Sequence, residues 1–258
     1  MKRYLIGALA GATLLGLFAC SNNNNSTPPF TGAFRLVNGT TDSTSISASA
    51  TSGFTSVGGN FDSAGSTVNP PEGSYNVQLT ESGASGPFTT VDNVQIQHNN
   101  VTTLYTYGTI GGGTANGFAV EENLTAPSGS NFTFQFVNDT TQSATATLDV
   151  YLVTPGAGIS GAQPVASVNA GAASTATPIS GGKYEIIVTN GTSIIYDSGS
   201  GQAGVVLPNT DTNVIQIGAL DATAAQAAPV ASGGADSPIT LMITDNNGGE
   251  ALHLNGQN

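Results

Sequence analysis

The stretch YEIIVTNGTSIIY (Tyr184–Tyr196) holds two short apolar runs that flank Asn190-Gly191. Both runs are rich in β-branched and aromatic residues, which favour extended backbone. Asn and Gly tolerate positive φ at both central positions of a tight turn, so this dipeptide between two such runs predicts a β-hairpin. We therefore expect antiparallel strands to organise the fold.

The same pattern of short apolar or β-branched runs, separated by turn residues, recurs along the chain. Helical spacing after the amino-terminal segment is confined to the short Ala-rich stretch Asp221–Ala228. We expect an all-β chain. Besides the hairpin, its predicted strands are Ala33–Val37, Ser45–Ala50, Tyr75–Thr80, Thr89–Ile96, Thr102–Tyr107, Phe118–Glu122, Phe132–Val137, Thr147–Val153, Asn213–Leu220 and Ile239–Thr244.

The second half of the chain repeats the first. FRLVNGTT at Phe34–Thr41 matches FQFVNDTT at Phe134–Thr141, 100 residues later. Further on, Thr103–Gly108 aligns with Asn213–Gly218 at an offset of 110, which sets Tyr105 opposite Ile215. The offset only grows, so the second copy carries insertions without rearrangement.

Two copies of about 100 residues predict two domains. We expect tandem antiparallel β-sandwiches of Ig-like architecture, the first at residues 31–127 and the second at 131–247. Residues 248–258 are expected to form a polar tail.

Several segments of the repeat resemble a known family. They are the FxxVN starts, DVYLVTPGA (Asp149–Ala157), the GGKYEIIVTNG hairpin and ITLMITDNNG (Ile239–Gly248). Together they are similar to bacterial secreted modules catalogued as domain of unknown function 4397, often found in tandem. The first copy has Ser45–Ala48 in place of the DVY element. The resemblance implies a β-sandwich in an exported envelope protein, and it offers no catalytic residue to carry over.

The amino-terminal segment MKRYLIGALAGATLLGLFAC (Met1–Cys20) has a basic start and an apolar run, the layout of a secretory signal. Its end, Leu17-Phe18-Ala19-Cys20, resembles the lipobox of bacterial lipoproteins. That resemblance implies that residues 1–19 are a signal peptide and that Cys20 carries fatty acyl chains such as palmitate. The other interpretation is an ordinary signal peptide with an incidental cysteine.

Residues 20–30 are then predicted to be the lipidated cysteine and a flexible tether, rich in Asn, Ser and Pro. By the same resemblance, Ser21 after the acylated cysteine directs the protein to the outer membrane of a Gram-negative bacterium. The expected location is therefore the cell envelope, with the membrane as partner through a lipid anchor at Cys20.

The charge balance excludes one class of partner. Charged residues make up 8% of the chain and the formal net charge is −12. Beyond the expected cleavage site, Arg35 and Lys183 are the only basic residues. Nucleic-acid binding needs clustered Lys and Arg to neutralise phosphates. No nucleic-acid partner is expected.

The sequence shows no catalytic motif. Its two histidines, His98 and His253, fall in a predicted turn and in the predicted tail, and no GxSxG motif occurs. Glu121 and Glu122 are adjacent on a predicted strand, so their side chains point to opposite faces and do not form a glycosidase pair. We expect a protein that is not an enzyme and binds no cofactor.

Calcium is the best candidate for a small ligand. Asp245, Asn247 and Glu250 offer the oxygen ligands that Ca²⁺ prefers, in a Gly-rich loop. The same residues are also typical of an ordinary turn. Tyr105 and Tyr107 share one strand face and suggest a sugar-stacking platform. However, the alignment with Ile215 and Ile217 indicates that both tyrosines pack into the core.

Two functions follow from the sequence. The first is a lipid-anchored cell-envelope protein with non-catalytic tandem β-sandwich modules, in a structural, adhesive or partner-binding role. The alternative is a calcium- or glycan-binding surface module that uses the loops at Asp221–Asp236 and Asp245–Glu250.

Overall fold

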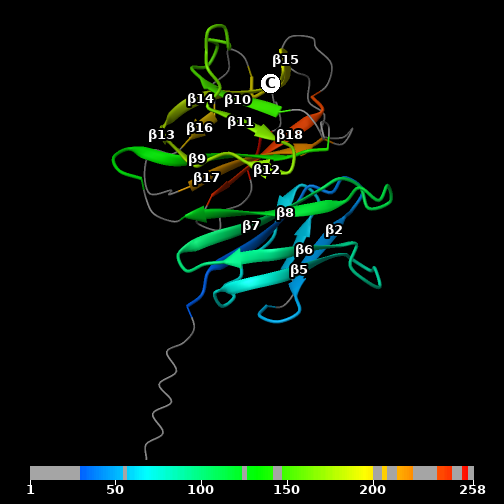
Figure 1. Ribbon diagram of the computed structural model, residues 1–258. Helices are drawn as coiled ribbons and strands as arrows, with labels where there is room; N and C mark the ends of the chain where they lie inside the picture. Colours follow the sequence, from blue (N-terminus) through cyan, green and yellow to red (C-terminus); the bar gives the residue numbers. More distant parts are fainter. Residues whose placement is uncertain are drawn as a thin grey trace, which may run out of the picture.

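The computed structural model describes residues 30–54, 57–123, 127–141, 147–199, 205–207, 214–222, 237–245 and 252–254. These residues form strands, turns and loops and contain no helix, which confirms the predicted all-β class (Figure 1). The amino-terminal segment, including Cys20 and the tether up to residue 29, lies outside the described residues.

Residues 33–123 form two sheets of four strands each. One sheet has the strand order β4-β1-β7-β8 and the other β3-β2-β5-β6. The strands are β1 (Ala33–Asn38), β2 (Ser45–Ala50), β3 (Val57–Asn60), β4 (Ser63–Ala64), β5 (Gly73–Glu81), β6 (Thr89–Ile96), β7 (Asn100–Tyr107) and β8 (Asn116–Asn123).

Residues 131–254 form two further sheets. One has the order β12-β9-β17-β18-β19, with β13 also paired to β9. The other has the order β11-β10-β14-β15, with β16 also paired to β14. The strands are β9 (Asn131–Asp139), β10 (Thr147–Val153), β11 (Ala166–Asn169), β12 (Ala172–Ala173), β13 (Thr177–Ser180), β14 (Gly182–Asn190), β15 (Ser193–Asp197), β16 (Val205–Leu207), β17 (Val214–Asp221), β18 (Ile239–Asp245) and β19 (Leu252–Leu254).

The predicted hairpin is present as β14 and β15. Asn190 pairs with Ser193, so the central residues of the turn are Gly191 and Thr192 rather than the predicted Asn190 and Gly191, and Gly191 has a left-handed φ of 60°. The expectation of antiparallel sheets holds for the other strand pairs but is wrong for β1 with β7 and β9 with β17, which run parallel. Between β1 and β7 the chain crosses to the opposite sheet, and such crossovers can join parallel neighbours.

Each half encloses its own core. In the first half, Phe34 and Leu36 of β1 contribute to an apolar cluster that also includes Ile46, Leu79 and Ile96. In the second half, a larger cluster contains three phenylalanines of β9, namely Phe132, Phe134 and Phe136. Alternate residues of β1 and β9 face the opposite side of their sheets. That opposite side is where the two halves meet.

The strand register corrects the alignment of the repeat. Val37 pairs with Tyr105, whereas its counterpart Val137 pairs with Gly218. Tyr105 is therefore equivalent to Gly218, not to Ile215, and the offset at this strand is 113 rather than 110. An error of three residues exchanges the two faces of a strand, because successive side chains alternate. The expectation that Tyr105 packs into the sandwich core was wrong for this reason.

The carboxyl-terminal region also differs from the sequence expectation. Leu252–Leu254, placed in the predicted polar tail, pairs with β18 as the short strand β19. A strand edge presents unpaired N–H and C=O groups, and a short extended segment satisfies them. Asp221 is the last residue of β17. Within each of the four sheets, the paired strands belong to the same half of the chain. The domain boundaries at residues 31–127 and 131–247 remain predictions.

Candidate functional site

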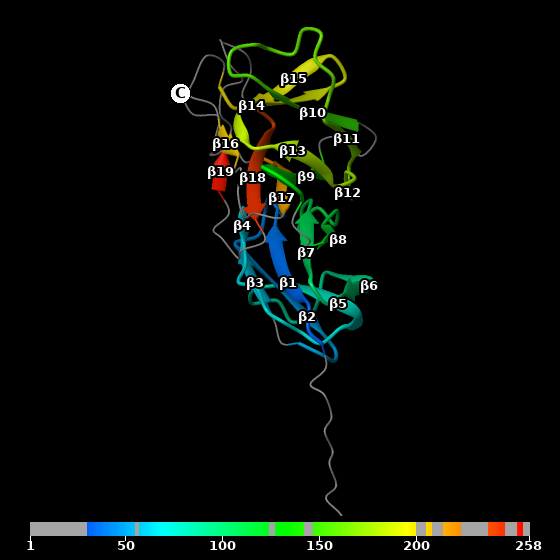
Figure 2. The same ribbon diagram turned by 90° about the vertical axis from the view of Figure 1, so that its left-hand side faces the viewer.

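The two halves meet through one sheet of each. The sheet β4-β1-β7-β8 lies against β9, β17 and β18 of the second half, with the first described residues at the far end of the first half (Figure 2). A separate apolar cluster fills this contact and draws on both halves: Val37, Tyr105, Val120, Val137, Leu220 and Met242. Equivalent strands of the repeat thus use equivalent faces to bind each other.

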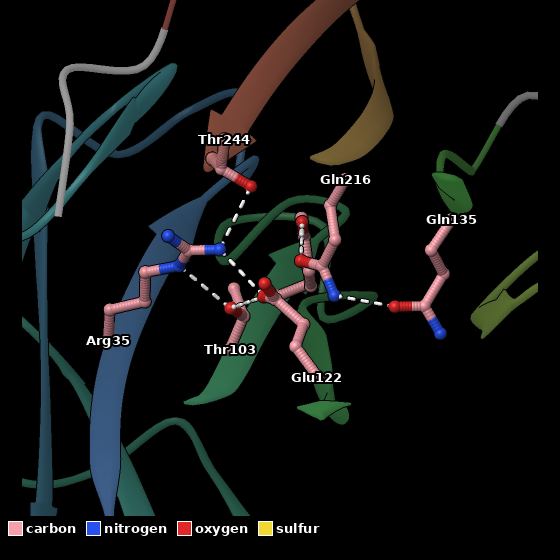
Figure 3. Close-up of polar contacts among 7 residues, drawn as sticks. Arg35, Thr103, Glu122, Gln135, Gln216 and Thr244 are labelled. Carbon is pink, nitrogen blue, oxygen red and sulfur yellow. Dashed lines mark hydrogen bonds and ion pairs between the residues drawn. The ribbon is translucent and has the colours of Figure 1, made fainter. Parts of the chain in front are cut away.

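Polar side chains are buried in the same contact. We call them the polar seam, and they are Arg35, Thr103, Tyr105, Glu122, Gln135, Gln216 and Thr244 (Figure 3). Each lies on a strand face that would be solvated in an isolated half. Because the other half covers this face, their hydrogen-bond partners have to come from other residues of the protein, either in the same half or across the contact.

Arg35 is the centre of the seam. Its Nη2 lies 2.7 Å from Glu122 Oε1 and donates to Thr244 Oγ1 of the second half at 3.0 Å. Its Nε donates to Thr103 Oγ1 at 2.8 Å, and Thr103 in turn donates to Glu122 Oε1 at 2.8 Å. The Arg35 and Glu122 side chains are 3% and 0% exposed. A charged pair this deeply buried depends on both partners, since either one alone would be an uncompensated charge.

Tyr105 carries the seam across to the second half. Its hydroxyl donates to Gln216 Oε1 at 2.8 Å, and Gln216 Nε2 donates to Gln135 Oε1 at 2.9 Å. Gln135 Nε2 ends the chain by donating to the carbonyl of Ser174 at 3.1 Å. Burial raises the pKa of Tyr105 well above its ordinary value, so the phenol stays a neutral donor.

The seam has no access to solvent, and its arginine and glutamate are already paired with each other. A buried network of hydrogen bonds and an ion pair fixes the geometry of its surroundings. The seam links the two halves through the hydrogen bonds from Arg35 to Thr244 and from Tyr105 to Gln216.

A second buried carboxyl group lies at the end of β9. Asp139 is completely buried, and neither of its carboxylate oxygens has a hydrogen-bond partner. Burial, with a smaller contribution from the Asp221 carboxylate, raises the pKa of Asp139 well above its ordinary value. Asp221 is itself held by the backbone N–H of Thr141 at 2.9 Å and by the Thr141 hydroxyl.

A third carboxyl group, Glu185, lies on β14. Its Oε2 accepts the Gly156 N–H at 2.7 Å, and its side chain shares a hydrogen bond with Asp197 of β15. Burial is the main cause that raises the pKa of Glu185, and the contact with Asp197 adds to it.

Several of the candidate site residues predicted from the sequence lie outside the part of the chain that the structure describes. Cys20, Asn247, Glu250 and the loop at 223–236 lie outside the described residues, as does the side chain of Asp245. The predicted calcium site is therefore not described. In the described part of the chain, no three His, Cys, Asp or Glu residues come together as metal ligands would.

The histidines and the glutamate pair are partly described. His98 is exposed in the turn between β6 and β7, with Nδ1 3.3 Å from the carbonyl oxygen of Thr31, while His253 is described only as backbone of β19. Glu121 is exposed and Glu122 is buried, which confirms that the two point to opposite faces. A glycosidase pair is not formed by them.

The tyrosines are not a sugar platform. Tyr105 is fully buried between the halves, stacked on Phe118 with ring centroids 5.8 Å apart, and Tyr107 is half-buried. Sequence reasoning missed Arg35 as a structural residue. The signal was present: an arginine between Phe34 and Leu36, inside a predicted strand, in a chain with few other bases.

Comparison with known proteins does not identify a family for this chain. No family model matches the chain, and a search of curated proteins finds no relative. Within the described residues there is also no helix of the length and apolarity needed to cross a membrane.

Proposed function

We propose that this protein is a lipid-anchored cell-envelope protein whose two β-sandwich modules, repeated in tandem and Ig-like in architecture, act as a non-catalytic scaffold. The buried polar seam is the observation that carries the scaffold role, because it joins the halves through charges and amides that no substrate reaches. The lipid anchor is supported by the lipobox-like sequence that ends in Cys20.

The placement of the chain's start supports this arrangement. The blue segment with which the described chain begins lies at the end of the first half that is remote from the second half (Figure 1). The ten residues Ser21–Phe30 reach at most about 35 Å when fully extended. An anchor at Cys20 would thus hold the first half near the membrane and present the second half away from it, as suits an adhesive or partner-binding module.

Metabolic labelling with radioactive palmitate tests the anchor. Wild type is expected to incorporate label and Cys20→Ala to lose it, because Cys20 is the only cysteine in the chain and both lipid attachments of a lipoprotein are made to that residue. Equal labelling of both proteins would reject the anchor. In a Gram-negative host, Ser21→Asp is the matched control: it should remain labelled but leave the outer-membrane fraction.

The scaffold role is tested by exposure on cells. Protease added to intact cells is expected to cut a displayed protein and to spare one that faces the periplasm. The result decides between a surface-adhesive role and a periplasmic partner-binding role.

A further inference from the structure

The first half contains a hollow of about 440 Å³ on the sheet β3-β2-β5-β6. It opens where the chain leaves β2 and where β5 faces β6. Its size falls within the range of roughly 300–1,000 Å³ that is typical of small-molecule sites. The lining residues are Ala50, Thr51, Ser52, Ser74, Tyr75, Asn76 and Asn93, and every one of them is neutral.

The backbone at the hollow is irregular. The β5–β6 register shifts between Tyr75 and Val77, where Asp92 and Asn93 of β6 face the single residue Asn76 of β5 as a bulge, and Asn93 has a φ of 58°. The N–H of Asn93 donates to Asn76 Oδ1 at 3.2 Å, which holds the Asn76 side chain. β-Bulges re-aim side chains and are frequent beside binding sites. In this sheet the bulge directs two amides toward one depression.

Neighbouring residues also fix the remaining polar wall. Gln95 Nε2 donates to Ser74 Oγ at 2.9 Å and to the carbonyl of Asn93 at 3.1 Å. The Tyr75 hydroxyl donates to the carbonyl of Pro71 at 2.8 Å, and Gly53 lies so close that a Cβ there would be 2.1 Å from the ring. The ring of Tyr75 is therefore held in one position, packed beside Phe54 against the core of the first half, and only part of it lines the hollow.

These groups select the class of ligand by charge. An anionic ligand would need a cation at the hollow, and none of the lining residues is basic; Arg35 is buried in the polar seam. A cation would need carboxylates, and none lines the hollow either. Hydroxyl and amide groups donate and accept hydrogen bonds with neutral hydroxyls, and an aromatic ring contacts the apolar face of a sugar.

We propose that this hollow binds a neutral oligosaccharide. Asn76, Asn93 and the hydroxyls of Thr51, Ser52 and Ser74 hydrogen-bond the sugar hydroxyls, and the part of Tyr75 that lines the hollow adds a small apolar contact. The proposal does not depend on the lipid anchor, because none of these residues belongs to the amino-terminal segment.

At the position of the second half that is equivalent to the hollow, the corresponding residues bond to one another. Ala50 pairs with Val77, and Leu152 pairs with the equivalent Ile186, so Thr154 corresponds to Ser52 and Glu185 to Asn76. There, Gly156 donates its N–H to Glu185 at 2.7 Å, and Asp197 bonds to the same carboxyl group. The loop after β10 thus bonds directly to Glu185, the residue equivalent to Asn76. The acids Glu185 and Asp197 are buried at a place where the first half has the amide side chain of Asn76.

This difference supplies a matched pair of variants. Ser52→Trp places a large ring at the mouth of the hollow, while Thr154→Trp places the same ring at the equivalent exposed position of the second half. Asn93→Gly removes one amide and keeps the positive φ that glycine adopts without strain. Urea unfolding of each variant checks that the fold is retained.

The experiment is a glycan array followed by NMR titration of the full chain, kept in dodecylphosphocholine so that no detergent sugar competes. The array carries neutral glucose, galactose, mannose and N-acetylglucosamine oligomers together with sialylated and sulfated glycans. We expect neutral glycans to bind, with shifts at residues 50–52, 74–76 and 93. Ser52→Trp should weaken binding at least tenfold and Asn93→Gly about fivefold, with Thr154→Trp equal to wild type.

Three results would overturn the proposal. They are an array without neutral hits and no NMR shifts at about 10 mM disaccharide, a preference for sialylated or sulfated glycans, or wild-type affinity in Ser52→Trp. Cys20→Ala is expected to bind glycans as wild type does. Failure of the anchor and failure of this site are therefore distinguished from each other.

Discussion

The ring of Tyr105 lies against Gly218, the residue that holds the same position in the other copy of the repeat. A Cβ at Gly218 would be 3.1 Å from Tyr105 Cε1. The two copies therefore differ at this position in a complementary way, one with a large ring and the other without a side chain. This asymmetry lets two similar sheet faces pack closely enough to bury the polar seam.

Filling this position should weaken the protein. Gly218→Leu would force the Tyr105 ring out of place, and overpacking of this kind costs about 1–3 kcal/mol of unfolding free energy. Urea unfolding measures the loss. Gly58 is the control, since a Cβ there meets nothing within 4 Å, and Gly58→Ala should change stability by less than about 0.5 kcal/mol. Equal effects of the two changes would show that Gly218 is not constrained by Tyr105.

Removing one charge of the buried Arg35–Glu122 pair should lower the unfolding free energy by more than Gly218→Leu does. Glu122→Gln keeps the shape of the side chain but leaves Arg35 without its counter-charge, and breaking a buried pair costs about 3–5 kcal/mol. The neighbouring exposed residue gives the control, because Glu121→Gln should change the unfolding free energy by less than about 0.5 kcal/mol. A similar small effect at Glu122 would mean that the pair is solvated.

Because Tyr105 and Gln216 share a hydrogen bond, the stability losses caused by substituting each of them should not be additive. Gln216→Leu leaves the Tyr105 hydroxyl and Gln135 Oε1 without these partners, and each buried unsatisfied group costs about 1–3 kcal/mol. Tyr105→Phe leaves Gln216 Oε1 unpaired. The double variant should therefore lose less stability than the sum of the single variants, with a coupling of about 0.5–3 kcal/mol in a urea-unfolding cycle. If the losses of the two single variants simply add in the double variant, the hydrogen bond between Tyr105 and Gln216 does not contribute to stability.

Asp139 should make stability fall as pH rises. Its pKa in the folded protein is raised above the ordinary 3.8, so over the interval between the two values the folded state binds more protons than the unfolded state. Stability is then greatest below about pH 4 for this group and is lost as the pH rises toward the folded pKa. Asp139→Asn should flatten this part of the profile, measured by urea unfolding from pH 4 to pH 8.

The control for this profile is Asp92, which is exposed on β6. Asp92→Asn should leave the pH dependence of unfolding as in wild type. A wild-type profile in Asp139→Asn would show that the Asp139 carboxyl group ionises as freely in the folded state as in the unfolded one.

The sequence by itself predicted the longer strands, whereas the short strands β3, β4, β11, β12, β13, β16 and β19 were not among its predictions. β-Branched runs and the Asn190-Gly191 turn favour strands and a hairpin through local sterics, and these preferences need no distant partner. The repeated FxxVN segments likewise placed equivalent first strands in β1 and β9. The opposite faces of Glu121 and Glu122 followed from the two-residue period of a strand.

Only the tertiary structure decided which strand faces are buried. Arg35, Thr103 and Gln216 are polar and alternate with apolar residues, a pattern that in one sandwich predicts a solvated face. That face is buried because the other half covers it, and the contacts that satisfy it join residues as far apart as Arg35 and Thr244. Local preference carries no information about such partners, since their pairing depends on how two complete sheets pack together.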